Sequence, residues 1–177
     1  MDEIYFVPDK IEFEPGIPFD VEVWLATPGI VAIDGVDVDI PLPEGVEKVN
    51  VVLTNLLGLN FLAPVDKILF LHTTNPPNKF SGTGKLATLT LKATVDTIMK
   101  FNFTVGATND TNMAVGGVDI LTDVNELIIK KGDPMAIDSV LLADLQTVAN
   151  THKDKLSKMT VTVTPITADE TVEIFPS

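Results

Sequence analysis

The sequence predicts an all-β fold, an antiparallel jelly-roll β-sandwich of about nine strands with a C-terminal amphipathic helix and β-hairpin appended. Two patterns favour it. Apolar and polar residues alternate with a period of two along much of the first 131 positions, and clusters of Gly, Pro and Asn separate the alternating runs. The chain also has 177 residues, enough for one large domain or for a domain with a small appendage.

Period-two alternation gives the strands in chain order. It is clearest at residues 19–25, 36–42, 87–93 and 101–105, and it puts one face of each strand on a core and the other toward water. Strands are therefore expected at 3–7, 10–14, 18–26, 31–42, 46–54, 66–73, 85–95, 99–106, 114–121 and 125–131. The turns between them are expected at 14–16, 43–45, 75–78, 81–84 and 116–117.

The pattern changes after residue 132. Asp133 and Pro134 suit a helix N-cap and first helical position, and apolar residues then recur at helical spacing, so a helix is expected at 134–149. Alternation returns around residues 161–163 and 172–174, which predicts a hairpin. The expected domains are a sandwich at 1–132 and a helix-plus-hairpin extension at 133–177, packed on the sandwich.

Composition excludes several classes of function. The net charge is −13, and all twelve basic residues are lysine, so nucleic acid and anionic membrane surfaces are poor partners. No apolar run approaches the ~20 residues of a membrane-spanning helix. The chain has no cysteine, which excludes thiol catalysis and disulfides. No acid, base and nucleophile set is visible, so the protein is not expected to be an enzyme.

Residues 81–92, with the sequence SGTGKLATLTLK, resemble a strand of cohesin domains. Residues 13–23 are similar to the cohesin start, and residues 36–52 resemble the third and fourth cohesin strands. The resemblance covers about residues 3–131. It implies a sandwich that binds a dockerin-bearing protein through a flat sheet face, without catalysis, outside the cell or on its surface. The leader needed for export is absent from the sequence.

The resemblance places the binding face on strands near 36–42 and 85–92. The outward residues expected there are Asp37, Asp39, Thr88, Thr90 and Lys92. On this interpretation, Asp39→Lys weakens partner binding and leaves the melting temperature unchanged. The alternative is that Asp37 and Asp39 are ordinary solvated acids on the outer face of a strand.

Trp24 and one loop have two interpretations each. Trp24 falls on the outward side of its strand, where it could anchor a partner or pack beneath a loop or the C-terminal hairpin. Asn109, Asp110 and Asn112 are weak calcium candidates, with Asp119 or Asp123 nearby, but an ordinary Asx turn also accounts for them. No other cofactor is expected.

Two other functions stay open. The chain could be a structural or assembly domain of a cell-surface or virion protein that forms homo-oligomers through 133–177. It could also be a carbohydrate-binding module, although such sites use several coplanar aromatic rings and aromatic residues make up only 6% of this chain.

Overall fold

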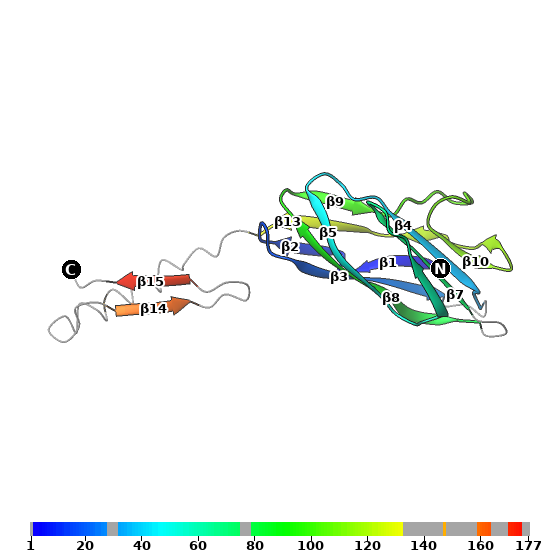
Figure 1. Cartoon of the computed structure of the whole chain (residues 1–177), viewed down its shortest axis with the longest axis horizontal. Coiled ribbons are helices and arrows are strands. Elements are labelled where there is room, and N and C mark those ends of the chain that lie inside the picture. The colour runs from blue at the N-terminus through cyan, green and yellow to red at the C-terminus, as the bar shows by residue number, and fades with distance from the viewer. Residues whose placement is uncertain are drawn as a thin grey trace. The chain divides into compact units, whose positions relative to one another are not determined.

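The computed structural model describes residues 2–27, 32–74, 79–132, 147, 159–163 and 170–174 (Figure 1). The chain divides into two compact units, Met1–Lys131 and Gly132–Ser177. In the described part of the chain, no helix is long and apolar enough to cross a membrane.

The first unit holds two five-stranded sheets. One has the strand order β12-β1-β3-β8-β5. Its strands are β1 (Glu3–Val7), β3 (Phe19–Thr27), β5 (Val46–Leu53), β8 (Gly82–Ala93) and β12 (Asp123–Val124). All neighbours are antiparallel except β1 and β12. We call this the β3–β8 sheet.

The second sheet is antiparallel throughout, with the order β11-β10-β4-β7-β6. Its strands are β4 (Gly35–Ile40), β6 (Gly58–Leu62), β7 (Ile68–Thr74), β10 (Asn112–Val115) and β11 (Val118–Asp119). We call this the β4–β7 sheet. A third, smaller sheet joins β2 (Lys10–Phe13), β13 (Glu126–Lys131) and β9 (Thr97–Lys100).

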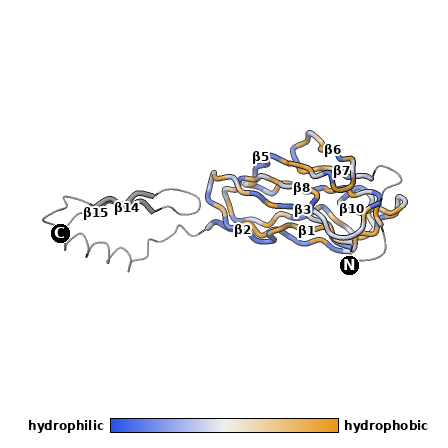
Figure 2. The backbone as a smooth tube through the Cα atoms, turned by 90° about the horizontal axis from the view of Figure 1, so that it is seen from below, coloured by the Kyte–Doolittle hydropathy of each residue, from blue (hydrophilic) through white to orange (hydrophobic). Residues whose placement is uncertain are grey.

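The predicted alternation is confirmed in the core of the first unit. Figure 2 shows hydrophobic and hydrophilic positions alternating along its strands. Every second residue of the central strands is buried, and burying each such side chain contributes about 1.5–3 kcal/mol. The inward residues of the central strands include Val21, Val23, Leu25, Val36, Val38, Ile40, Ile68, Phe70, Leu89 and Leu91. The all-β prediction is therefore correct for this unit.

Several expected elements differ from the structure. The strand expected at 99–106 ends at Lys100, and residues 101–111 instead form an irregular segment. The strand expected at 114–121 is interrupted at Gly116 and Gly117, whose φ angles of 58° and 80° make a tight turn between β10 and β11. β6 was not predicted, because its alternation of apolar and polar residues spans only residues 59–61, too short a run to indicate a strand.

In the second unit, β14 (Met159–Val163) pairs antiparallel with β15 (Glu170–Ile174). The helix predicted at 134–149 lies outside the described residues except for Thr147. The packing of this unit on the sandwich remains a prediction.

His72 on β7 is a titratable side chain that is fully buried, with 0% of its surface exposed. Its ring packs edge-on against Phe70, with centroids 5.6 Å apart, and neither ring nitrogen has a hydrogen-bond partner among the described residues. Burial lowers the pKa of His72. The nearby backbone of Leu86 raises this pKa by a smaller amount, so the net shift is downward. The neutral ring is therefore the form that suits the folded core.

We expect the free energy of unfolding to fall as the pH drops below about 6.5, where His72 becomes protonated in the unfolded chain but resists protonation in the folded one. Urea denaturation at pH 7.5 and pH 5 measures this loss. In His72→Leu, the loss between the two pH values should shrink, while contributions from other titratable groups remain. An equal loss in both proteins would show that His72 does not cause it.

Candidate functional site

The two predicted binding strands lie in different sheets. β4 carries Asp37 and Asp39 in the β4–β7 sheet, whereas β8 carries Thr88, Thr90 and Lys92 in the β3–β8 sheet. In a sandwich, the outward sides of the two sheets face away from each other. The prediction that these five residues share one flat face is therefore wrong.

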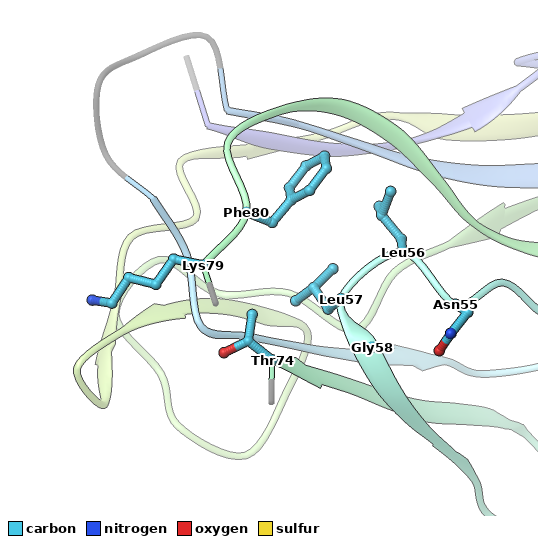
Figure 3. A pocket seen from close by; sticks show the side chains of 7 residues that line it. All are labelled: Asn55, Leu56, Leu57, Gly58, Thr74, Lys79 and Phe80. Atoms are coloured by element: carbon cyan, nitrogen blue, oxygen red, sulfur yellow. The ribbon is translucent and has the colours of Figure 1, made fainter. Parts of the chain in front are cut away.

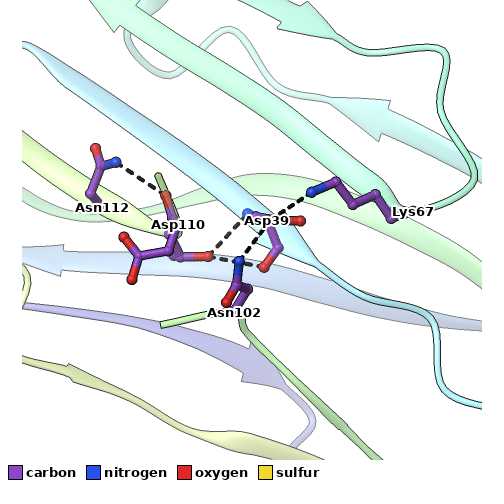
Figure 4. A network of polar contacts seen from close by, with 6 residues as sticks. Asp39, Lys67, Asn102, Asp110 and Asn112 are labelled. Carbon is purple, nitrogen blue, oxygen red and sulfur yellow. Dashed lines mark hydrogen bonds and ion pairs between the residues drawn. The ribbon is translucent and has the colours of Figure 1, made fainter. Parts of the chain in front are cut away.

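Asp39 is buried, so its predicted exposure is also wrong. Its residue surface is 5% exposed, and its Oδ2 accepts hydrogen bonds from Lys67 Nζ at 2.7 Å and Asn102 Nδ2 at 2.9 Å (Figure 4). Thr111 Oγ1 bonds both the Asp39 backbone N–H and its carbonyl, each at 3.0 Å. The irregular segment 101–111 therefore binds the outward side of β4 at Asp39, which no local pattern in the sequence shows.

Asp37 has a different environment two residues earlier. Its residue surface is only partly buried. Burial and the nearby Asp39 carboxylate raise the pKa of Asp37, and Lys67 counteracts part of this effect. Asp37 is therefore the member of the predicted pair that a partner can reach.

An apolar patch lies beside Asp37 on the outward side of the β4–β7 sheet. It consists of Leu59, Phe61 and Leu71, which are 51%, 61% and 40% exposed. Phe61 on β6 is opposite Leu71 on β7, and Leu71 is opposite Asp37 on β4. Asn112 on β10 continues this row across a fourth strand. The row combines exposed apolar groups with one carboxylate and one amide.

The apolar patch was not predicted from the sequence, because β6 was not predicted. One signal was available: residues 49–65 contain no charged side chain, although the whole chain has 37 of them, 12 basic and 25 acidic. A stretch of this length without charge is unusual for a surface segment of an acidic protein.

The outward side of the β3–β8 sheet is internally bonded. Trp24 donates its indole N–H to Glu22 Oε2 at 2.8 Å, and Lys85 Nζ contacts Glu22 Oε1 at the same distance. These bonds lower the pKa of Glu22, the Lys85 bond being the larger cause. Tyr5 is opposite Trp24 on the neighbouring strand. The Trp24 indole is thus hydrogen-bonded within the chain on this face, and both interpretations of Trp24 stay predictions.

The Thr88, Thr90 and Lys92 side chains are half-buried on the same face. Thr90 Oγ1 donates to Asp20 Oδ1 at 2.7 Å on the adjacent strand. These bonds engage polar groups that a partner would otherwise meet. This face therefore offers fewer free polar groups than the prediction supposed.

The weak calcium candidates form hydrogen bonds with nearby residues of the chain. Asp110 Oδ2 accepts the Thr104 N–H at 2.6 Å, and Asn112 Nδ2 donates to the Asp110 carbonyl at 3.1 Å. Asp119 Oδ1 accepts the N–H groups of Met113 and Leu121, both at 3.0 Å. Across the ranges that the structure describes, no group of three or more His, Cys, Asp or Glu side chains is arranged to hold a metal ion.

A small pocket of about 210 Å³ lies where β6 begins and β7 ends (Figure 3). Its volume is below the ~300–1,000 Å³ of typical small-molecule sites. Its lining residues are Asn55, Leu56, Leu57, Gly58, Thr74, Lys79 and Phe80.

No protein-family model matches the sequence, and no curated protein matches it either. Solved structures do match the fold. A cohesin from Clostridium acetobutylicum, solved in complex with a dockerin, has a TM-score of 0.59 at 15% identity and covers 75% of this chain and 100% of its own. The third ScaB cohesin of R. flavefaciens, in complex with a group 1 dockerin, has a TM-score of 0.57 at 15% identity, with 76% and 98% covered.

A non-cellulosomal cohesin from the archaeon Archaeoglobus fulgidus gives a TM-score of 0.54 at 13% identity and covers 80% of this chain and 96% of its own. The first unit therefore has a cohesin-like fold, which confirms the resemblance seen in the sequence. At these identities the likeness concerns the fold alone.

Proposed function

We propose that this chain is a non-catalytic protein-binding module whose partner docks on the outward side of the β4–β7 sheet. The observation that carries the proposal is the apolar patch of Leu59, Phe61 and Leu71, with Asp37 beside it. Apolar anchors next to a small number of polar groups are the usual composition of a binding hot spot.

The proposed partner is a dockerin-bearing protein. Three of the structurally similar cohesins were solved in complex with dockerins, which supports this class of partner. The charge also suits it: the face presents the Asp37 carboxylate on a chain of net charge −13, so a partner surface with lysine or arginine would be attracted. An extracellular or cell-surface location accords with the same proposal.

Leu71→Asp is expected to weaken binding of the partner by about 30-fold or more, because a hot-spot substitution costs about 2 kcal/mol or more. Leu71 is at the centre of the row that joins Phe61 to Asp37. Isothermal titration of a panel of dockerin modules, with calcium and with a chelator, measures the affinity.

Val52→Asp is the matched control. Val52 is an exposed aliphatic residue, 56% accessible, but it lies on β5 of the other sheet, opposite Thr88. The affinity of the Val52→Asp variant for the partner should stay within about threefold of the wild-type affinity. If Val52→Asp lost binding and Leu71→Asp kept it, the partner would dock on the β3–β8 sheet instead. If no dockerin bound the wild-type chain, the proposed partner class would be wrong.

A further inference from the structure

The outer edges of the two five-stranded sheets differ in how they are protected. An open edge strand exposes unpaired backbone groups, and proteins usually protect it by shortness, charge, proline or a bulge. β11 and β12 have two residues each, with Asp119 in one and Asp123 in the other. β5 carries Glu47 and Lys48, and its pairing with β8 shifts register just after Lys48.

β6 has none of these protections. It runs over Gly58–Leu62, contains no charge or proline, and pairs with β7 without a register shift. All five residues are exposed, and its other side has no strand partner in the part of the chain that the structure describes. Only Gly58, with a φ of 106°, departs from ordinary extended geometry. β6 is therefore an unprotected edge that can accept another strand.

The backbone groups that point outward from β6 can be identified. The Ala63 N–H donates to the Leu69 carbonyl at 2.9 Å, directly after the β6–β7 ladder. Hydrogen-bonded pairs alternate along an antiparallel ladder, so Leu59 and Phe61 also bond β7. Gly58, Asn60 and Leu62 then direct their N–H and C=O groups to the open edge.

We infer that β6 pairs antiparallel with β6 of a second copy of this chain, about a twofold axis at Asn60, to form a dimer with a continuous sheet. In this register, Asn60 pairs with Asn60 of the second copy, and Gly58 pairs with Leu62 of the second copy. All the backbone groups at the open edge then take part in about six hydrogen bonds between the two copies. The contact is self-complementary, as a twofold interface requires. The axis is perpendicular to the sheet, so Leu59 lies beside Phe61 of the second copy on the outward side.

The distribution of charge along the chain favours contact between two copies at the β6 edge. Two chains of net charge −13 repel each other, and residues 49–65 form a stretch without charge where they can approach. Added salt should therefore strengthen the dimer, because it screens the repulsion and leaves the uncharged contact intact. This contact is distinct from the partner docking proposed above, since it uses the backbone edge of β6.

The test uses the full chain without any dockerin, so it succeeds or fails independently of the partner titration. Sedimentation velocity over roughly 10–500 μM should show a monomer–dimer equilibrium, as expected for a small interface. Asn60→Pro removes an outward N–H without removing a bond to β7, and the dimer should weaken at least tenfold. Asn60→Ser, which loses the same side-chain amide but keeps the backbone N–H, should dimerise like the wild type.

A cross-link tests the register. The chain has no cysteine, so Asn60→Cys introduces a single thiol that would face its copy at about 5.5 Å between Cα atoms, within disulfide range. Val118→Cys, at an exposed position on the opposite edge of the same sheet, is the control. Asn60→Cys should form a covalent dimer at least tenfold faster. A chain that stays monomeric at 500 μM, equal rates for the two thiols, or a dimer that survives Asn60→Pro would each overturn the inference.

Discussion

Asp39→Lys is expected to lower the free energy of unfolding by about 3–5 kcal/mol, the usual cost of an uncompensated charge at a buried position. The Asp39 side chain is only 7% exposed, and its carboxylate contacts Lys67 at 2.7 Å and Asn102 at 2.9 Å. A lysine there would place a second ammonium group beside Lys67 and leave the Asn102 amide without its acceptor. Urea denaturation at pH 7 measures the change. This expectation replaces the one from the sequence, in which Asp39→Lys leaves the melting temperature unchanged.

Asp37→Lys is the matched control for Asp39→Lys. It makes the same charge change two residues away, on the same strand and the same side of the sheet, but at a position that is only partly buried. We expect a loss below about 1 kcal/mol. Equal losses in the two variants would show that overall charge, rather than the buried contacts of Asp39, determines the effect.

Phe101→Ala is expected to destabilise the chain by about 3–5 kcal/mol, the usual range for a buried phenylalanine. Phe101 is 6% exposed, and its ring stacks on Phe6 with centroids 4.3 Å apart and planes 20° apart. This contact fixes the start of segment 101–111, which covers Asp39. Denaturation measures the global loss, and hydrogen exchange at the Asn102 N–H, which donates to the Asp39 carbonyl, measures the loosening of the segment.

Phe103→Ala is the comparison for Phe101→Ala. Phe103 lies in the same segment but is only partly buried against the core. Its loss should be clearly smaller, and the Asn102 N–H should keep most of its protection. A loss as large as that of Phe101→Ala would mean that the Phe6–Phe101 stack has no special role in holding the segment.

Local sequence patterns predicted the positions of the strands better than they predicted which residues share one face of the sandwich. The alternation at 19–25 and 36–42 correctly gives the inward residues of β3 and β4, because side-chain direction depends only on position along a strand. It cannot say which sheet a strand joins, since that depends on pairing between distant residues. This is why Asp37 and Thr88 were placed on one face although they lie on two.

The candidate site was only partly predictable for the same reason. Asp37 was identified from the sequence, but the burial of Asp39 depends on Lys67, Asn102 and Thr111, which lie 28 to 72 residues away. The apolar patch required β6, which follows the apolar pair Leu56 and Leu57 and alternates only over residues 59–61, too short a run to indicate a strand.

The central claim is that a protein partner docks on the outward side of the β4–β7 sheet. Amide hydrogen exchange of the full chain, with and without a saturating dockerin module that binds it, tests this most directly. The account predicts new protection in β6, β7 and β4, around Phe61, Leu71 and Asp37, with little change around Trp24 and Thr88. New protection confined to β3 and β8 would contradict it.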